Sequence, residues 1–161
     1  MRRYLLVLLP IFLAAEPAVI EHSTVYRHPY SNPYDARNET GFNHAPNVAV
    51  MADGRLVAVW FSGAYEASVN QMVLISYSAN QRRSWTPPDV FSDVPRMSDF
   101  DPALLVDGKR AWGFFSVGRW IRWPFVSDEK LMVGENSFQI YQRYSDDAGR
   151  SWSQAAAASC S

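Results

Sequence analysis

The feature that most constrains this chain is a repeated order of short apolar runs and turn signals. An apolar run beginning with proline is followed by Asp-Gly and then by a second apolar run that contains aromatic residues, and the same order returns further along the chain. Asp-Gly between two apolar runs is a strong β-hairpin signal. The two copies are 46–51, Asp53-Gly54 and 55–63, and then 102–106, Asp107-Gly108 and 109–116.

An eight-residue motif follows the second copy at 145–152, with the pattern Ser-x-Asp-x-Gly-x-Ser-Trp. Its aspartate can accept hydrogen bonds from backbone N–H groups of the same turn, and its glycine adopts a positive φ at no steric cost. The serines can bond the local backbone, and the tryptophan is a large apolar anchor for the hairpin. This pattern is an Asp-box, also called a BNR repeat. Its residues are Ser145, Asp147, Gly149, Ser151 and Trp152.

An altered copy of the motif lies upstream at 78–85, with Asn80 in place of the aspartate and Arg82 in place of the glycine. Asparagine still suits such a turn, whereas arginine suits a left-handed backbone less well. The Asp-Gly turns are 54 residues apart, but the eight-residue motifs are 67 residues apart. The difference predicts an insertion in the second copy, at roughly 117–135.

A repeat of this length with several short strands is typical of a β-propeller blade. We therefore predict an all-β fold, since no period of 3.6 residues is found after residue 20. The alanine-rich stretch after Trp152 makes a poor strand, so the chain is expected to end inside a blade. Strands are predicted at 46–51, 55–61, 71–78 and 88–92 in a first blade (44–95), and at 102–106, 110–116 and 137–144 in a partial second blade (96–161).

The N-terminus predicts export. Residues 1–18 have a basic start, a short apolar core and small residues after it, as in a secretory signal peptide. The apolar run is shorter than the roughly 20 residues that span a membrane, although an uncleaved anchor is an alternative. A polar, proline-interrupted arm is predicted at 19–43. The expected location is secreted or periplasmic, with no other membrane span.

Composition excludes several classes of protein. A net charge of −1 gives no basic surface for nucleic acid, and Cys160, the only cysteine, rules out an intramolecular disulfide. The three histidines are too scattered to predict a metal site, and no phosphate-binding loop is present. We expect neither a metal nor another cofactor.

Residues 43–153 resemble the sialidase superfamily, in its BNR-repeat branch. The resemblance is carried by the intact Asp-box, by Asn43-His44-Ala45-Pro46 and by Trp60-Phe61-Ser62-Gly63. It implies a six-bladed propeller when complete, of which this chain would be an N-terminal fragment of about two blades. It further implies an active site at one end of the central channel, where terminal sialic acids are cleaved by means of three arginines, a tyrosine nucleophile paired with a glutamate, and an aspartate acid/base.

Only some of the site residues that the family uses have a counterpart in this sequence. The family motif aromatic-Arg-Ile-Pro reads Asn43-His44-Ala45-Pro46 here, so His44 stands in place of an arginine that would bind the substrate carboxylate. The family's acid/base aspartate lies between that strand and the first Asp-box. The only carboxylate between Gly54 and Ser78 is Glu66. The other arginines, the tyrosine and its glutamate belong to later blades.

Three residues are candidates for catalysis. His44 could donate a hydrogen bond to a sugar near neutral pH, or be satisfied by backbone at a strand edge. Glu66 could be a general acid, or an ordinary loop acid in water, which is the more common case. Asp101, like the neighbouring Asp99, could line the channel and bind sugar hydroxyls, or cap the turn before Pro102. Asp147 is rejected, because its turn lies on the blade's outer side and uses its own polar groups.

Arg119, Trp120 and Arg122 are candidates for substrate binding at the start of the predicted insertion. Guanidinium groups suit a sugar carboxylate, and an indole suits a ring face. The alternative is an Arg–Trp stack that fixes the loop.

Two functions are carried forward. The first is an exported exo-α-sialidase-like glycosidase acting on terminal acidic sugars of glycans, with this fragment inactive alone. The second is a non-catalytic BNR propeller that binds glycans or another protein. Under either function, isolated residues 19–161 are expected to be poorly soluble or to self-associate, because two blades leave a sheet edge and an apolar flank exposed.

Overall fold

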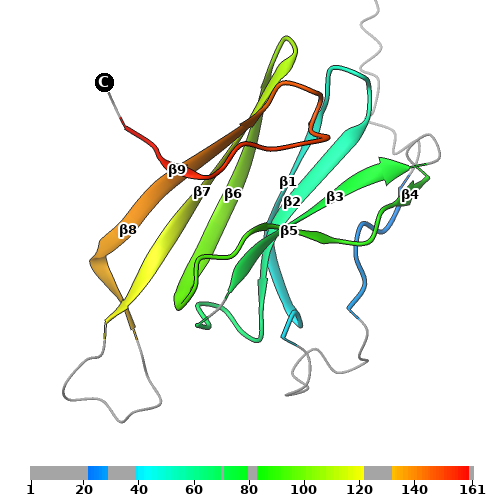
Figure 1. Cartoon of the computed structure of the whole chain (residues 1–161). Helices are drawn as coiled ribbons and strands as arrows, with labels where there is room; N and C mark the ends of the chain where they lie inside the picture. Colours follow the sequence, from blue (N-terminus) through cyan, green and yellow to red (C-terminus); the bar gives the residue numbers. More distant parts are fainter. Residues whose placement is uncertain (1–21, 29–38, 70, 80–82, 122–131, 160–161) are drawn as a thin grey trace, which may run out of the picture.

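The computed structural model describes residues 22–28, 39–69, 71–79, 83–121 and 132–159, and it consists of two antiparallel sheets packed face to face (Figure 1). The regular secondary structure of these residues consists of strands. Among these residues there is no helix of the length and hydrophobicity needed to cross a membrane. The first sheet has the order β1-β2-β3-β4, with β5 also paired to β3, and the second has the order β6-β7-β8-β9. The strands are β1 (Phe42–Val50), β2 (Leu56–Gly63), β3 (Met72–Ala79), β4 (Ser84–Trp85), β5 (Asp89–Ser92), β6 (Met97–Asp107), β7 (Arg110–Ile121), β8 (Met132–Ser145) and β9 (Ala156–Ala157).

The predicted all-β class is confirmed, and each predicted strand lies within or beside an observed one. Both ends of the predicted insertion, at roughly 117–135, are strand and lengthen the hairpin. β7 continues to Ile121 and β8 begins at Met132, and the two strands pair there through Gly118 with Phe138 and Trp120 with Val133. The hairpin pairing therefore continues past the core, and residues 122–131 lie outside the described residues.

A β-bulge before a proline occurs at the same place in both sheets. In the first sheet Ala45 and Pro46 lie opposite the single residue Trp60 of β2. In the second sheet Asp101 and Pro102 lie opposite the single residue Phe115 of β7. Ala45 and Asp101 both have positive φ, at 47° and 45°. Proline has no N–H to donate to the ladder, so within a sheet it is tolerated at a bulge, where the ladder is already interrupted.

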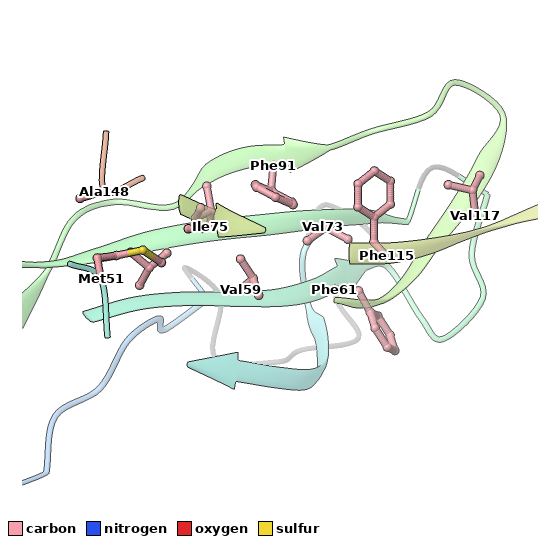
Figure 2. Close-up of a cluster of buried hydrophobic side chains, with 11 residues drawn as sticks. Met51, Val59, Phe61, Val73, Ile75, Phe91, Phe115, Val117 and Ala148 are labelled. Carbon is pink, nitrogen blue, oxygen red and sulfur yellow. The ribbon is translucent and has the colours of Figure 1, made fainter. Parts of the chain in front are cut away.

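The hydrophobic core lies between the sheets (Figure 2). The first sheet contributes alternate residues of β2 and β3 together with Phe91 of β5, and β7 of the second sheet packs against them. Full burial of such a side chain contributes roughly 1.5–3 kcal/mol. Gly113 of β7 is required by this packing, since a Cβ there would lie 2.5 Å from Phe91. The buried core residues are Met51, Val57, Val59, Phe61, Val73, Ile75, Phe91, Ala111, Phe115, Val117 and Ala148.

The other face of the first sheet is covered by residues 22–28, which belong to the predicted N-terminal arm. Tyr26 stacks on Trp60 with ring centroids 5.7 Å apart, and its hydroxyl bonds the Thr40 hydroxyl at 2.9 Å. The Trp85 indole N–H donates to the Ser23 hydroxyl at 2.9 Å. The segment is extended but not a strand. The predicted signal peptide lies outside the described residues.

Candidate functional site

The register of the strands brings the predicted site residues to one end of the two sheets. β1 begins where β2 ends, with Phe42 opposite Gly63, and β6 begins where β7 ends, with Met97 opposite Arg119. We call this the site end. It carries His44, Glu66, Asp99, Asp101, Arg119 and the backbone of Trp120. The 145–152 motif, which follows β8, lies at the opposite end.

His44 is an exposed residue of β1 directly before the bulge. Its ring packs edge-on against Phe61, with centroids 5.4 Å apart. It also lines a cleft of about 430 Å³ that runs between β1, β2 and residues 25–28, with Tyr26 and Trp60 among its walls. Asn43 in the same cleft is engaged, because it accepts from the Trp60 indole at 2.8 Å. The imidazole of His44 is therefore a polar group in the lining of a largely apolar cleft.

Glu66 is an exposed residue of the connection between β2 and β3. The adjacent Ala67 has a φ of 58° and donates its N–H to the side-chain oxygen of Gln71 at 2.9 Å. The Gln71 side chain is fully buried and donates to the carbonyl of Asp99 in β6 at 2.8 Å, while the Asp99 N–H donates to the Gln71 carbonyl at 2.9 Å. The connection that carries Glu66 is thus held by the second sheet.

Asp99 is fully buried between the sheets, so it cannot contact a ligand at the surface. Neither carboxylate oxygen has a hydrogen bond of normal geometry within the described structure. Burial raises the pKa of this carboxyl to about 6, and the nearby Asp93 adds to the shift. Ser92 and the Val94 backbone lie close enough to oppose it in part. The burial of Asp99 therefore excludes direct contact between its carboxylate and a sugar.

Ser68 and Ser98 complete a buried polar cluster with Gln71 and Asp99. The Ser98 hydroxyl donates to the Ser68 carbonyl at 2.5 Å, and the Ser68 hydroxyl has no partner in the described part of the chain. Sequence reasoning missed Ser68, Gln71 and Ser98. They come from two segments far apart in the sequence, the connection between β2 and β3 and the start of β6, and the only local signal was the position of Asp99 before the second inner strand.

Asp101 and Arg119 are exposed at the site end, the first in the bulge of β6 and the second near the end of β7. The backbone of Trp120 pairs with Val133, and its side chain lies outside the described structure. Arg122 lies outside the described residues altogether. The structure gathers His44, Glu66, Asp101 and Arg119 at one end, and among the described side chains it records no hydrogen bond or ion pair between any two of them.

The 145–152 motif satisfies its own polar groups. Asp147 accepts from the Ser145 hydroxyl at 2.7 Å, from the Ser151 N–H at 2.9 Å and from the Ser151 hydroxyl at 2.6 Å. These bonds, those of Ser151 first, hold the pKa of Asp147 well below its ordinary value. Gly149 has a φ of 79° and donates its N–H to the Ser145 hydroxyl at 2.8 Å. A carboxylate that is ionised at neutral pH and fully hydrogen-bonded has no role as an acid catalyst.

The same motif fastens the second sheet to the first. The Trp152 indole N–H donates to the Tyr77 hydroxyl at 3.0 Å, and its ring meets Phe91 edge-on at 5.0 Å. The Arg55 guanidinium donates to the Ala148 carbonyl at 2.8 Å. The motif therefore has a structural role, remote from the site end.

The described residues contain no group of three or more His, Cys, Asp or Glu side chains arranged to hold a metal ion. The chemistry available at the site end is thus that of an imidazole, exposed carboxylates, a guanidinium and aromatic surface.

No protein-family model matches this sequence, and no curated protein matches it. Solved structures do. The Hadza microbial sialidase Hz136 is 20% identical, with a TM-score of 0.56, over 74% of this chain and 26% of that one. The intramolecular trans-sialidase from Ruminococcus gnavus, in complex with oseltamivir carboxylate, is 11% identical, with a TM-score of 0.55, over 74% of this chain and 49% of that one.

A protein of unknown function from Dyadobacter fermentans DSM 18053 is also similar, at 20% identity and a TM-score of 0.50, over 70% of this chain and 35% of that one. This chain therefore spans between about a quarter and a half of the length of these neighbours. At such identities the likeness shows the fold alone. The chain has a sialidase-like, all-β fold.

Proposed function

We propose that the natural protein is an exported sialidase-type glycoside hydrolase that acts on terminal acidic sugars of glycans, on a six-bladed propeller with Asp-box repeats. One observation carries the proposal. The candidate residues His44, Glu66, Asp101 and Arg119 gather at one end of the sheets, whereas the motif aspartate lies at the other end with its hydrogen bonds satisfied. The sialidase-like fold supports it.

Each residue then has a chemical role. Arg119 with Arg122 would bind the sugar carboxylate, because a guanidinium presents a planar set of donors that matches it. Glu66 and Asp101 are exposed carboxylates at the site end, so either can reach a glycosidic oxygen as a general acid. His44 would donate to a sugar hydroxyl from the rim of its cleft. The nucleophile would come from another blade.

Glycan binding without hydrolysis is the second candidate, and the cleft at His44 favours it. Tyr26 and Trp60 give this cleft stacked aromatic walls, and a histidine replaces the arginine that the family motif uses for the substrate carboxylate. A neutral sugar would suit such a cleft better than a sialic acid, because aromatic faces bind apolar sugar faces and no fixed positive charge is needed.

Release of 4-methylumbelliferone from its sialic acid and glucuronic acid conjugates tests hydrolysis in the natural protein. Glu66→Gln or Asp101→Asn is expected to lower kcat by roughly 100-fold or more if that residue is the acid. Asp107→Asn, an exposed acid at the turn between β6 and β7 at the opposite end of the sheets, is the matched control and leaves the rate unchanged. Binding on a glycan array without release, abolished by His44→Ala, would establish the second function instead. Neither release nor binding would reject both.

A further inference from the structure

Two Asp-Gly dipeptides form turns in this chain, and the two turns place the aspartate in different surroundings. The first, Asp53-Gly54, joins β1 to β2, and the second, Asp107-Gly108, joins β6 to β7. Both glycines have positive φ, at 83° and 59°, and both dipeptides are followed by a basic residue. Because the local sequences are so similar, a difference in reactivity between the two turns has to come from the fold.

The carboxylate of Asp53 is fixed by three hydrogen bonds. It accepts from the Arg55 N–H at 3.1 Å, from the Arg55 guanidinium at 2.8 Å and from the Arg150 guanidinium at 2.9 Å. The bond from the Arg55 side chain is the main cause that holds the pKa of Asp53 below its ordinary value. The Gly54 N–H is engaged as well, since it donates to the Met51 carbonyl at 2.8 Å. Both groups of this dipeptide are therefore committed to other partners.

The turn at Asp107 lacks these restraints. The Asp107 side chain is exposed, and its carboxylate makes no hydrogen bond or ion pair within the described residues. The Gly108 N–H also has no hydrogen bond in the described part of the chain, and the space beside the Gly108 Cα is open. The side-chain carboxyl group and the amide nitrogen that follows it are therefore free to approach each other.

We propose that Asp107 is a site of spontaneous modification, which the natural chain converts to isoaspartate, whereas Asp53 is protected by its hydrogen bonds. The Gly108 nitrogen attacks the side-chain carboxyl carbon of Asp107, so a C–N bond forms and a C–O bond breaks. The amide proton and the carboxyl OH leave as one water, which gives a five-membered cyclic imide. Water then adds to either imide carbonyl and produces aspartate or isoaspartate. The net reaction is an isomerisation that needs no oxidant and no enzyme.

The product changes the turn at the end of the sheets opposite the site end, so this inference is independent of the proposed hydrolysis. In isoaspartate the main chain runs through the side-chain methylene, and the former main-chain carboxyl group becomes a free carboxylate. Asp107 pairs with Arg110, which donates to the Asp146 carboxylate at 2.6 Å and 2.9 Å, so the longer turn disturbs the start of β7. A free α-carboxylate in an exposed turn is the group that S-adenosylmethionine-dependent isoaspartyl methyltransferases methylate.

The test compares the two turns within one chain. The natural chain is kept folded at pH 5 and 37 °C, and the peptides that contain Asp53 and Asp107 are analysed over time by electron-transfer fragmentation, which distinguishes isoaspartate. Isoaspartate is expected to form roughly tenfold faster or more at Asp107, because Asp53 first has to break hydrogen bonds to charged groups. In guanidinium chloride the two rates should become similar. Methyl transfer by an isoaspartyl methyltransferase should rise in parallel with the modification at Asp107.

Variants serve as controls for the chemistry and for the protection. Asp107→Glu should abolish the reaction, because its imide would need a six-membered ring, and Asp107→Asn is the positive control, since it forms the same imide with loss of ammonia. Arg55→Gln combined with Arg150→Gln removes two of the three donors to Asp53 and should speed its reaction in the folded chain, with folding checked by near-ultraviolet circular dichroism.

The comparison in the natural chain decides the proposal even if the arginine variants do not fold. The proposal is wrong if Asp107 forms no isoaspartate, or if Asp53 reacts as fast as Asp107 in the folded chain. A difference between the two rates that persists in guanidinium chloride would also overturn it, since flanking residues and not the fold would then cause the difference.

Discussion

Asp99 and Asp147 lie at opposite ends of the two sheets and in opposite surroundings. Asp147 accepts hydrogen bonds from Ser145 and Ser151, which lower its pKa, whereas Asp99 is buried without a bond of normal geometry, which raises its pKa to about 6. The end of the sheets that carries the 145–152 motif, which we call the motif end, is therefore stabilised by its hydrogen bonds. The site end carries a cost in stability, and costly polar groups of this kind are concentrated at functional sites.

The largest effect is expected at the motif end from Trp152→Ala. The substitution removes the indole that contacts Phe91 and bonds Tyr77, and it leaves a cavity between the sheets. We expect a loss of about 3 kcal/mol in the free energy of unfolding, measured with urea at pH 7. Trp112→Ala on the exposed face is the matched control and should cost less than about 1 kcal/mol. If both variants lose the same free energy of unfolding, the contacts of Trp152 between the sheets do not account for its effect.

Asp99→Asn is expected to change how stability depends on pH. The folded pKa of about 6 lies above the ordinary value of 3.8, so the folded state binds a proton more tightly than the unfolded state between these values. Stability then falls as the pH rises from about 4 to 6 and stays low above it. The shift corresponds to roughly 3 kcal/mol, so the variant should be more stable than the natural chain at pH 8 and similar at pH 4. Parallel pH profiles would contradict this account.

Gln71→Ala tests how the second sheet holds the connection that carries Glu66. It leaves the Ala67 N–H and the Asp99 carbonyl without their buried partner, so a loss of about 2 kcal/mol is expected in urea unfolding. Glu66→Gln in the same exposed connection should change stability by less than about 0.5 kcal/mol. If the two variants unfold alike, Gln71 does not support the connection.

Asp147→Asn should have a smaller effect, because asparagine keeps one carbonyl oxygen as an acceptor. Its pH dependence has the opposite sign to that of Asp99. The lowered pKa of Asp147 stabilises the fold above about pH 4 and is lost as the pH falls further. Thermal unfolding should therefore show a lower Tm for the variant at pH 7, with the difference shrinking below pH 4. A difference that is as large at pH 2 as at pH 7 would mean that the charge is unimportant.

Local chemistry explains which parts of the fold could be predicted from the sequence. The hairpins at Asp53-Gly54 and Asp107-Gly108 and the turn at 145–152 depend on residues close together in the chain, and the strands lie around them as expected. The buried cluster could not be predicted, because Ser68, Gln71 and Asp99 meet only when the sheets pack. The length of β7 and β8 was missed for a related reason, since their pairing continues beyond the core.

The candidate site was predicted only as a set of residues at one end. His44, Glu66, Asp101 and Arg119 reach that end because strand register is fixed by the hairpins. The burial of Asp99 could not be predicted, since an aspartate close to a proline in a predicted strand is usually a surface residue. The roles of Trp120 and Arg122 stay predictions, as do secretion and the self-association of residues 19–161.

The contacts of the 145–152 motif have a consequence for synthesis on the ribosome. Arg55 is bonded to Ala148, 93 residues later, and Asp53 to Arg150, 97 residues later. A chain is synthesised from its N-terminus at roughly 5–20 residues per second, so several seconds pass between synthesis of the first sheet and synthesis of the motif that contacts it. During that interval its apolar face is open to chaperones and to neighbouring nascent chains. β7 begins to cover that face before the motif emerges, and the motif supplies the last contacts that close it.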